Sequence, residues 1–234
     1  MLLNDPHEMR VPLEGGAATT ALLYPSAEPG VGATYILAHG AGAGQRSQFI
    51  VDFGRALSAL GLDVVTFNFP FTEQHRRIPD RTPVLEHCYR KVIDTVRAEI
   101  ASARSTLVIG GKSMGGRMAT HVAAADRQRT LAGLVLLGYP LHPPGKPHQR
   151  RDTHLPSIGR PILFVQGSRD AFGTPDELAP IVATLHPTPT LHVVANGDHS
   201  FKVPKQNPMA QAAVYVDVQR AIVNWVAALK PEAM

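Results

Sequence analysis

The sequence predicts an α/β protein with a mostly parallel central sheet of about seven to eight strands and helices on both faces. Apolar, β-branched runs alternate with amphipathic stretches, the pattern of βα units. Several runs, IGRPILFVQG for instance, are apolar throughout, which is typical of strands covered on both faces. With 234 residues, 44% of them hydrophobic, the chain can bury a substantial core. We expect one domain spanning residues 1–234.

Seven segments are expected to be strands because β-branched or aromatic residues are concentrated in them and turn-forming residues lie at their ends. These segments are Thr19–Tyr24, Thr34–Ala38, Asp63–Phe69, Thr106–Gly110, Leu134–Gly138, Pro161–Gln166 and Thr190–Val194.

Amphipathic stripes predict five helices between and after these strands. The first ends at Gly61, which can take the left-handed conformation that closes a helix. The second begins at Thr82-Pro83, and its apolar stripe contains the only cysteine, Cys88. The fourth opens on a capping box, Thr174-Pro175-Asp176-Glu177. The expected helices cover residues 49–60, 82–100, 114–124, 174–185 and 207–229, and the last, opening at Asn207-Pro208, turns Val214, Val218, Ile222, Trp225 and Leu229 inward.

Two connections, Pro70–Arg81 and Tyr139–Gly159, are longer than the rest, and long ordered loops are often functional. The second could form a basic rim that attracts acidic substrates or partners, or a solvated loop with ordinary surface charges. We favour the solvated loop. No cysteine or carboxylate pairs with its histidines at ligand spacing, so no metal is expected. Its basic residues are His142, Lys146, His148, Arg150, Arg151 and His154.

The stretch IGGKSMGGRMA, residues 109–119, fits two incompatible motifs. Gly111-Lys112-Ser113 resembles the end of a phosphate-binding loop, Gly-x-x-x-x-Gly-Lys-Ser/Thr. That loop needs a glycine five residues before Gly111, where this chain has Thr106. Without the first glycine the backbone cannot wrap around a phosphate, so this interpretation fails.

The same residues fit Gly-x-Ser-x-Gly, in which a nucleophilic serine occupies a sharp turn between a strand and a helix. Gly111 and Gly115 flank Ser113 at the two positions where a strained turn tolerates little bulk. Taken alone, the motif is also common as a glycine-rich turn with an incidental serine. Other residues must therefore decide whether Ser113 is a nucleophile.

A serine hydroxyl becomes nucleophilic when a base accepts its proton and an acid holds that base in one tautomer. Two later strands run into GSRDAFGTP and ANGDHSF, so Asp170 and His199 follow the carboxyl ends of successive strands. Open α/β sheets place their sites there. We expect His199 to be the base and Asp170 the acid, and we interpret Asp198 as a residue that shapes the loop.

An acyl-transfer site also needs two backbone N–H groups that stabilise the developing oxyanion. The residue after the nucleophile, Met114, supplies one of them. The other is assigned to Ala41, because HGAGAG follows the strand 34–38 and its small residues let the backbone approach a substrate carbonyl. We expect His39 to be structural and Lys112 to point away from the cleft.

Charge and composition exclude several classes of function. The net charge of +4 is modest and the basic residues are dispersed, so nucleic-acid binding is not expected. Binding of nucleic acid or an acidic protein by residues 142–154 stays a third hypothesis. No segment reaches the apolar length of a membrane span, and charged residues interrupt the N-terminal region where a secretory signal needs an apolar run. We expect a cytoplasmic protein without a cofactor.

At HGAGAG, GKSMGG, GSRDAFG and GDHSF the chain resembles the α/β-hydrolase superfamily, from about Thr34 to the last helix. Within it the sequence is similar to the small dienelactone-hydrolase-related group, and most to the compact hydrolase-like domains in a subunit of the nonspecific-lethal chromatin complex. The resemblance implies the α/β-hydrolase fold. It assigns the nucleophile, acid, base and oxyanion amides to Ser113, Asp170, His199, Ala41 and Met114.

Two departures from these relatives limit what the resemblance implies. Dienelactone hydrolases use a cysteine nucleophile, so their substrate does not carry over to a chain with Ser113. Where many members insert a helical lid, residues 139–160 are short and proline-rich, which predicts a minimal lid and an open cleft. The leading hypothesis is a serine hydrolase of small carboxylic esters or thioesters working through an acyl-enzyme. The alternative is a non-catalytic interaction module with the same fold.

Overall fold

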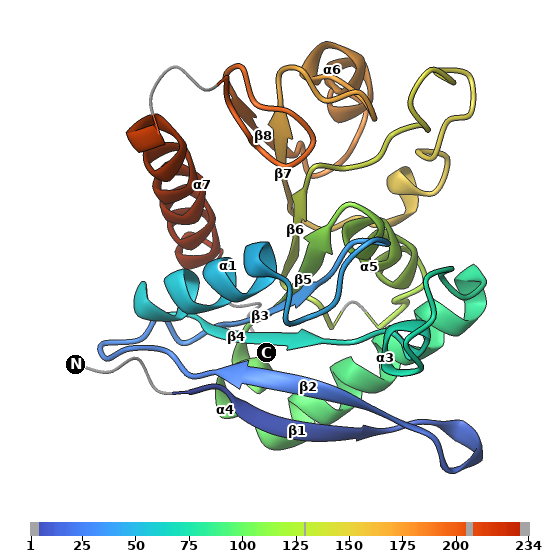
Figure 1. Cartoon of the computed structure of the whole chain (residues 1–234), viewed down its shortest axis with the longest axis vertical. Coiled ribbons are helices and arrows are strands. Elements are labelled where there is room, and N and C mark those ends of the chain that lie inside the picture. Colours follow the sequence, from blue (N-terminus) through green and yellow to red (C-terminus); the bar gives the residue numbers. More distant parts are fainter. Residues whose placement is uncertain (1–4, 129, 205–207, 230–234) are drawn as a thin grey trace.

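The computed structural model describes residues 5–128, 130–204 and 208–229, and a single eight-stranded sheet runs through it (Figure 1). The strand order is β1-β2-β4-β3-β5-β6-β7-β8. β2 pairs antiparallel with β1 and β4, and every other neighbouring pair is parallel. The bounds are β1 His7–Pro12, β2 Ala18–Tyr24, β3 Thr34–Ala38, β4 Asp63–Phe67, β5 Leu107–Lys112, β6 Gly133–Leu137, β7 Ile162–Gly167 and β8 Thr190–Val194.

Helices cover both faces of this sheet, which confirms the predicted architecture (Figure 1). α1 and α7 pack on one face, and α3, α5 and α6 pack on the other. Alternate residues of β3 enter the two cores, Tyr35 with the first set of helices and Ile36 with the second, because side chains alternate along a strand. The bounds are α1 Gln48–Ala59, α2 Pro70–Glu73, α3 Thr82–Glu99, α4 Ala101–Ser105, α5 Met114–Ala124, α6 Pro175–Val182 and α7 Pro208–Ala227.

The structure corrects the predicted elements at a few places. The strand β1 was not predicted, because only Met9 and Val11 of this edge strand are buried and charged residues alternate with them. The connection expected at Pro70–Arg81 opens with the short helix α2. The expected start of the last helix at Asn207 lies outside the described residues. The capping box of α6 and the burial of Cys88 are confirmed.

The parallel strands bring distant loops together at one edge of the sheet. β3, β5, β6, β7 and β8 all point the same way, so the segments that follow them converge at their carboxyl ends. The segment between β6 and β7, described in full, contains only the 3₁₀ turn η2, Leu155–Ser157, where a helical lid would stand. Among the described residues, no helix has the length and apolar character that crossing a bilayer requires.

The buried hydroxyl of Tyr89 on α3 holds the centre of β5. It donates a hydrogen bond to the carbonyl of Gly110 at 2.7 Å and accepts one from the Gly110 N–H at 3.0 Å. Gly110 is required there, because a methyl group would lie 1.8 Å from the carbonyl oxygen of Val135. Tyr89 therefore satisfies backbone groups that water cannot reach.

Replacing Tyr89 by phenylalanine is expected to lower the free energy of unfolding by roughly 1–3 kcal/mol, since the Gly110 groups would stay buried without that partner. Urea unfolding measures the change. Tyr215→Phe is the matched control, because the half-buried Tyr215 hydroxyl makes only a 3.4 Å contact with the carbonyl of Ser200. Equal losses in both variants would contradict this role for Tyr89.

Candidate active site

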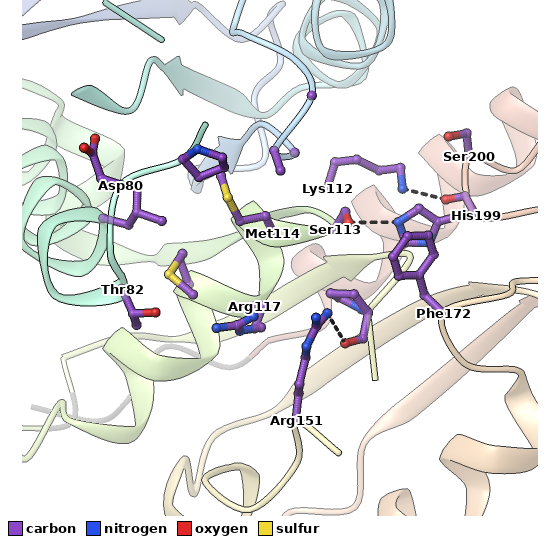
Figure 2. Close-up of a pocket in the computed structure, with 17 residues that line it drawn as sticks. Asp80, Thr82, Lys112, Ser113, Met114, Arg117, Arg151, Phe172, His199 and Ser200 are labelled. Carbon is purple, nitrogen blue, oxygen red and sulfur yellow. Dashed lines mark hydrogen bonds between the residues drawn. The ribbon is translucent and has the colours of Figure 1, made fainter. Parts of the chain in front are cut away.

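A cavity of about 540 Å³ opens at the carboxyl edge of the sheet (Figure 2). It is lined from the loop after β3, the turn between β5 and α5, and the segments after β6, β7 and β8. The far end of the connection 70–81 also contributes Pro79 and Asp80, so that segment forms one wall. All the predicted site residues except the buried Asp170 line this cavity, namely Ala41, Ser113, Met114 and His199.

Ser113 occupies a strained turn between β5 and α5, with φ 53° and ψ −115°. This left-handed conformation is rare for a residue with a side chain. The flanking glycines let the turn press against β3: a methyl group on Gly111 or Gly115 would lie 2.4 or 2.5 Å from the carbonyl oxygen of Ala38. Two glycines thus permit the approach, and the Ser113 side chain is directed into the cavity (Figure 2).

The structure brings Ser113, His199 and Asp170 into one hydrogen-bonded chain. His199 Nε2 lies 2.8 Å from Ser113 Oγ, and His199 Nδ1 lies 2.7 Å from Asp170 Oδ2. The carboxylate of Asp170 is buried and can only accept, so Nδ1 carries the proton and Nε2 offers its lone pair to the serine hydroxyl. The three residues come from three different strand ends, 29 to 86 positions apart in sequence.

A residue that the sequence analysis missed, Gln166, fixes the carboxylate. Gln166 at the end of β7 is fully buried, and its Nε2 donates to Asp170 Oδ2 at 2.8 Å and to the carbonyl of Gly173 at 2.7 Å. The other oxygen, Oδ1, accepts from the Phe172 N–H at 2.8 Å. Gln166 lies in a strand that is otherwise apolar, and no sequence pattern indicates that its side chain contacts Asp170. The contact is evident only from the fold.

The imidazole of His199 is packed on one side and its loop is tied down on the other. The Phe172 ring stacks on it with centroids 4.2 Å apart. Asp198 Oδ1 accepts from the backbone N–H groups of Ser200 and Lys202 at 2.7 and 2.9 Å, in agreement with its expected role as a loop-shaping residue. These contacts restrict the orientation of the His199 ring.

The expectation that Lys112 points away from the cleft is wrong. Its side chain is buried along the cavity and its Nζ donates to the carbonyl of His199 at 2.5 Å (Figure 2). Burial lowers the pKa of Lys112 to about 8, and the negative charges of Asp170 and Asp198 oppose this shift. Lys112 is therefore a link between the nucleophile turn and the histidine loop.

The two residues whose backbone amides are expected to bind the oxyanion line the same cavity as Ser113. Ala41 belongs to the loop after β3, and Met114 is the first residue of α5. Within the described chain neither N–H donates to a protein acceptor, so both are available to a ligand. A negative charge there is also favoured by the N-terminus of α5.

His39 has the structural role that the sequence predicts. It is fully buried; its Nδ1 donates to the Gly40 carbonyl at 2.7 Å and its Nε2 accepts from the Phe69 N–H at 3.2 Å. Burial lowers the pKa of His39 to about 4, although the bond to Gly40 opposes the shift. A neutral His39 thus holds the Ala41 loop against the segment after β4.

The prediction of a solvated loop at residues 142–154 is correct only in part. Lys146, His148 and Arg150 are exposed. His142, by contrast, is buried and lies 3.1 Å from the carboxylate of Glu177. The His154 ring lies 2.8 Å from the Thr120 hydroxyl, and Arg151 lines the cavity. Half of the loop's basic residues therefore pack against other parts of the chain: His142 contacts α6, His154 contacts α5, and Arg151 lies in the cavity wall.

Known proteins share this fold over almost the whole chain. A family model described as an alpha/beta hydrolase domain matches residues 31–227. XC6422 from Xanthomonas campestris, an α/β serine hydrolase without a lid, is 20% identical with a TM-score of 0.73, covering 99% of this chain and 97% of that one. Dienelactone hydrolase from Anabaena variabilis is 18% identical with a TM-score of 0.69, covering 94% and 99%. Est1E from Butyrivibrio proteoclasticus, with ferulic acid bound, is 14% identical with a TM-score of 0.69, covering 92% and 99%.

The chain therefore belongs to the alpha/beta hydrolase family, as the four sequence segments indicated. The fold class predicted from the sequence is confirmed.

Replacing Gly115 by alanine is expected to lower the free energy of unfolding by roughly 1–3 kcal/mol or more, because the methyl group would meet the carbonyl oxygens of Ala38 and His39 at 2.5 and 2.6 Å. Gly42→Ala is the control, since nothing lies within 4 Å of a methyl group there. Thermal unfolding of both variants checks the difference. A Gly115→Ala protein as stable as Gly42→Ala would show that the approach of β3 can relax.

Acid is expected to destabilise the protein through His39. In the unfolded chain His39 has its ordinary pKa of about 6.5, whereas in the native state its pKa is about 4. Between these values the unfolded chain binds a proton that the native state does not bind. Stability is therefore complete above about pH 6.5 and falls as the pH drops toward about 4, with a loss of about 2 kcal/mol at pH about 5 from this residue. Urea unfolding at several pH values, compared between wild type and His39→Gln, isolates this contribution. Identical pH dependence in the two proteins would exclude it.

Proposed function

We propose that this member of the α/β-hydrolase family is a serine hydrolase that cleaves small carboxylic esters or thioesters through an acyl-enzyme. The observation that carries the proposal is the continuous chain from Asp170 through His199 to Ser113, with donor–acceptor distances of 2.7 and 2.8 Å. A serine, a neutral imidazole and a buried carboxylate in this order can activate a hydroxyl at neutral pH.

In the acylation half-reaction, Ser113 Oγ attacks the substrate carbonyl carbon while its proton passes to His199 Nε2. Asp170 stabilises the imidazolium that forms and keeps Nδ1 protonated. The oxygen of the tetrahedral intermediate gains a negative charge, which the Ala41 and Met114 amides can bind. When the intermediate collapses, the bond to the leaving group breaks and His199 gives its proton to the departing alcohol or thiol.

The deacylation half-reaction repeats these roles with water. A water molecule replaces the leaving group, His199 removes one of its protons, and the oxygen attacks the acyl carbon. Collapse of the second intermediate returns a proton to Ser113 and releases the carboxylic acid. No cofactor or metal is required by this sequence of steps, since every proton moves between the substrate, water and these residues.

Positioning residues support this reaction. Gln166 holds the carboxylate of Asp170, and Lys112 ties the histidine loop to the nucleophile turn. Because the first contact is buried and the second partly buried, they fix the geometry before a substrate arrives, which lowers the reorganisation that the reaction needs.

Replacing Ser113 by alanine is expected to lower the rate of hydrolysis of a short p-nitrophenyl ester by roughly 10⁴-fold or more, and His199→Ala by a comparable factor. Asp170→Asn is expected to lower kcat by roughly 10³- to 10⁴-fold, because the wrong tautomer of His199 would be favoured. Ser157→Ala, an exposed serine on η2, is the matched control.

A fluorophosphonate probe gives the second measurement, because it labels rapidly only an activated serine. Labelling of wild type and of Ser157→Ala, but not of Ser113→Ala, is expected. Equal hydrolysis by wild type and Ser113→Ala, together with no labelling, would favour the non-catalytic interaction module instead.

A further inference from the structure

Arg117 is a charged residue of the cavity that has no anionic partner. It lies one helical turn after Ser113 on α5 and lines the same cavity as the serine. Its Nε atom is buried without a hydrogen-bond partner, and within the described residues no carboxylate pairs with its guanidinium group. Arg117 is partly buried, and a cation that loses water without gaining an anion is costly, so a bound anion would stabilise it.

Arg151 lies on the same side of the cavity and, like Arg117, has no carboxylate partner among the described residues. Its Nη1 donates to the Pro140 carbonyl at 3.3 Å, and in the described structure it forms no ion pair. Burial lowers the pKa of Arg151, and the positive charge of Arg117 lowers it further, so the two groups are close enough to repel each other. Figure 2 shows both side chains on the wall below Ser113.

The one acidic residue of the cavity wall does not compensate these charges. Asp80 pairs with Arg76 at 2.5 Å, on the connection that forms the opposite side of the cavity. Some other arginines of this protein have acidic partners, Arg150 with Asp152 at 2.7 Å for instance. The positive charge is therefore concentrated beside Ser113, and an anion bound there would relieve both repulsion and desolvation.

We propose that Arg117 and Arg151 form a subsite for a carboxylate carried by the substrate, so that the protein prefers anionic esters. The inference rests on the proposed function, because the subsite adjoins Ser113. The planar guanidinium group matches a carboxylate with two parallel N–H···O bonds. Arg117 starts about one turn, ~5.4 Å, from the serine, so the carboxylate and the scissile ester belong to one small molecule. Half-esters of dicarboxylic acids and esters of hydroxy acids fit this description.

Two pairs of esters test the subsite and locate the charge. The first comparison, monomethyl glutarate with dimethyl glutarate, tests a carboxylate on the acyl side of the ester. The second comparison, the 4-acetoxybenzoate anion with its methyl ester, tests a carboxylate on the leaving group. For at least one pair, wild type is expected to hydrolyse the anion with about tenfold or greater kcat/KM than the neutral ester. The pair that shows the preference identifies the side on which the carboxylate binds.

Charge-removing variants identify the arginines. Arg117→Gln and Arg151→Gln are each expected to lower the ratio of kcat/KM, anionic over neutral, by about tenfold or more. Arg127→Gln, the same substitution on an exposed arginine just beyond α5, leaves the ratio unchanged. Because two variants are tested, the result still holds if one of them fails to fold. Ser113-dependent turnover with equal rates for charged and neutral esters in both pairs would overturn the subsite and keep the proposed function.

Binding separates failure of the subsite from failure of the proposed function. Calorimetric titration of Ser113→Ala with monomethyl glutarate and with 4-acetoxybenzoate is expected to show, for at least one of the two anions, binding that Ser113→Ala/Arg117→Gln lacks and that salt weakens. If wild type hydrolyses none of the esters, the proposed function fails, and this titration still decides the subsite. Equal binding of both anions by the two proteins, or binding of neither anion by Ser113→Ala, would overturn it.

Discussion

The close approach of the nucleophile turn to β3 is the constraint on which the site depends. Gly111 and Gly115 both face the Ala38 carbonyl at distances that no Cβ atom could occupy. This contact bends the backbone at Ser113 into a conformation with φ 53°, and it sets the end of β3 directly beside the start of α5. Consequently Ala41 and Met114 line one cavity together with Ser113. Strain at Ser113 is maintained because packing on both sides leaves the turn no alternative.

A buried polar network extends this geometry across the sheet edge. Gln166, Asp170 and His199 are joined by hydrogen bonds, and Lys112 connects the same loop to β5. Each of these groups is costly to bury alone, but in the network their polar atoms find partners. The network also explains why a lysine can occupy the position before the nucleophile: its ammonium group has the His199 carbonyl as acceptor and two nearby carboxylates as counter-charges. Rigidity of the histidine loop therefore follows from electrostatics as much as from apolar packing.

How far the sequence predicts this structure depends on the range of the interactions involved. Parallel strands such as Thr34–Ala38 can be predicted because a strand buried on both faces is apolar throughout. Asp170 follows another buried strand, β7, whereas His199 follows β8, a partly exposed strand that its β-branched residues still identify. The edge strand β1 buries one face only and carries charges on the other, so its alternation was too weak to identify. The direction of Lys112 and the path of Arg151 depend on contacts between segments far apart in the chain, which local patterns do not encode.

The connection between β6 and β7, all of which the structure describes, has no helical lid, and it places Arg151 in the cavity wall. An inserted helical lid would cover the site with a separate layer. Here the segment 139–160 instead contacts α6 through His142 and Glu177 and α5 through His154 and Thr120. Those two anchors fix the stretch between them, and Arg151 in that stretch is placed beside Arg117. The cavity walls include apolar side chains, among them Leu85, Met118 and Phe172, and such side chains can contact a substrate without fixing the position of a charge on it. Selectivity for a charged substrate must come from charge and hydrogen bonding in the walls, and Arg117 and Arg151, which have no carboxylate partner in the described structure, are the cations placed to supply it.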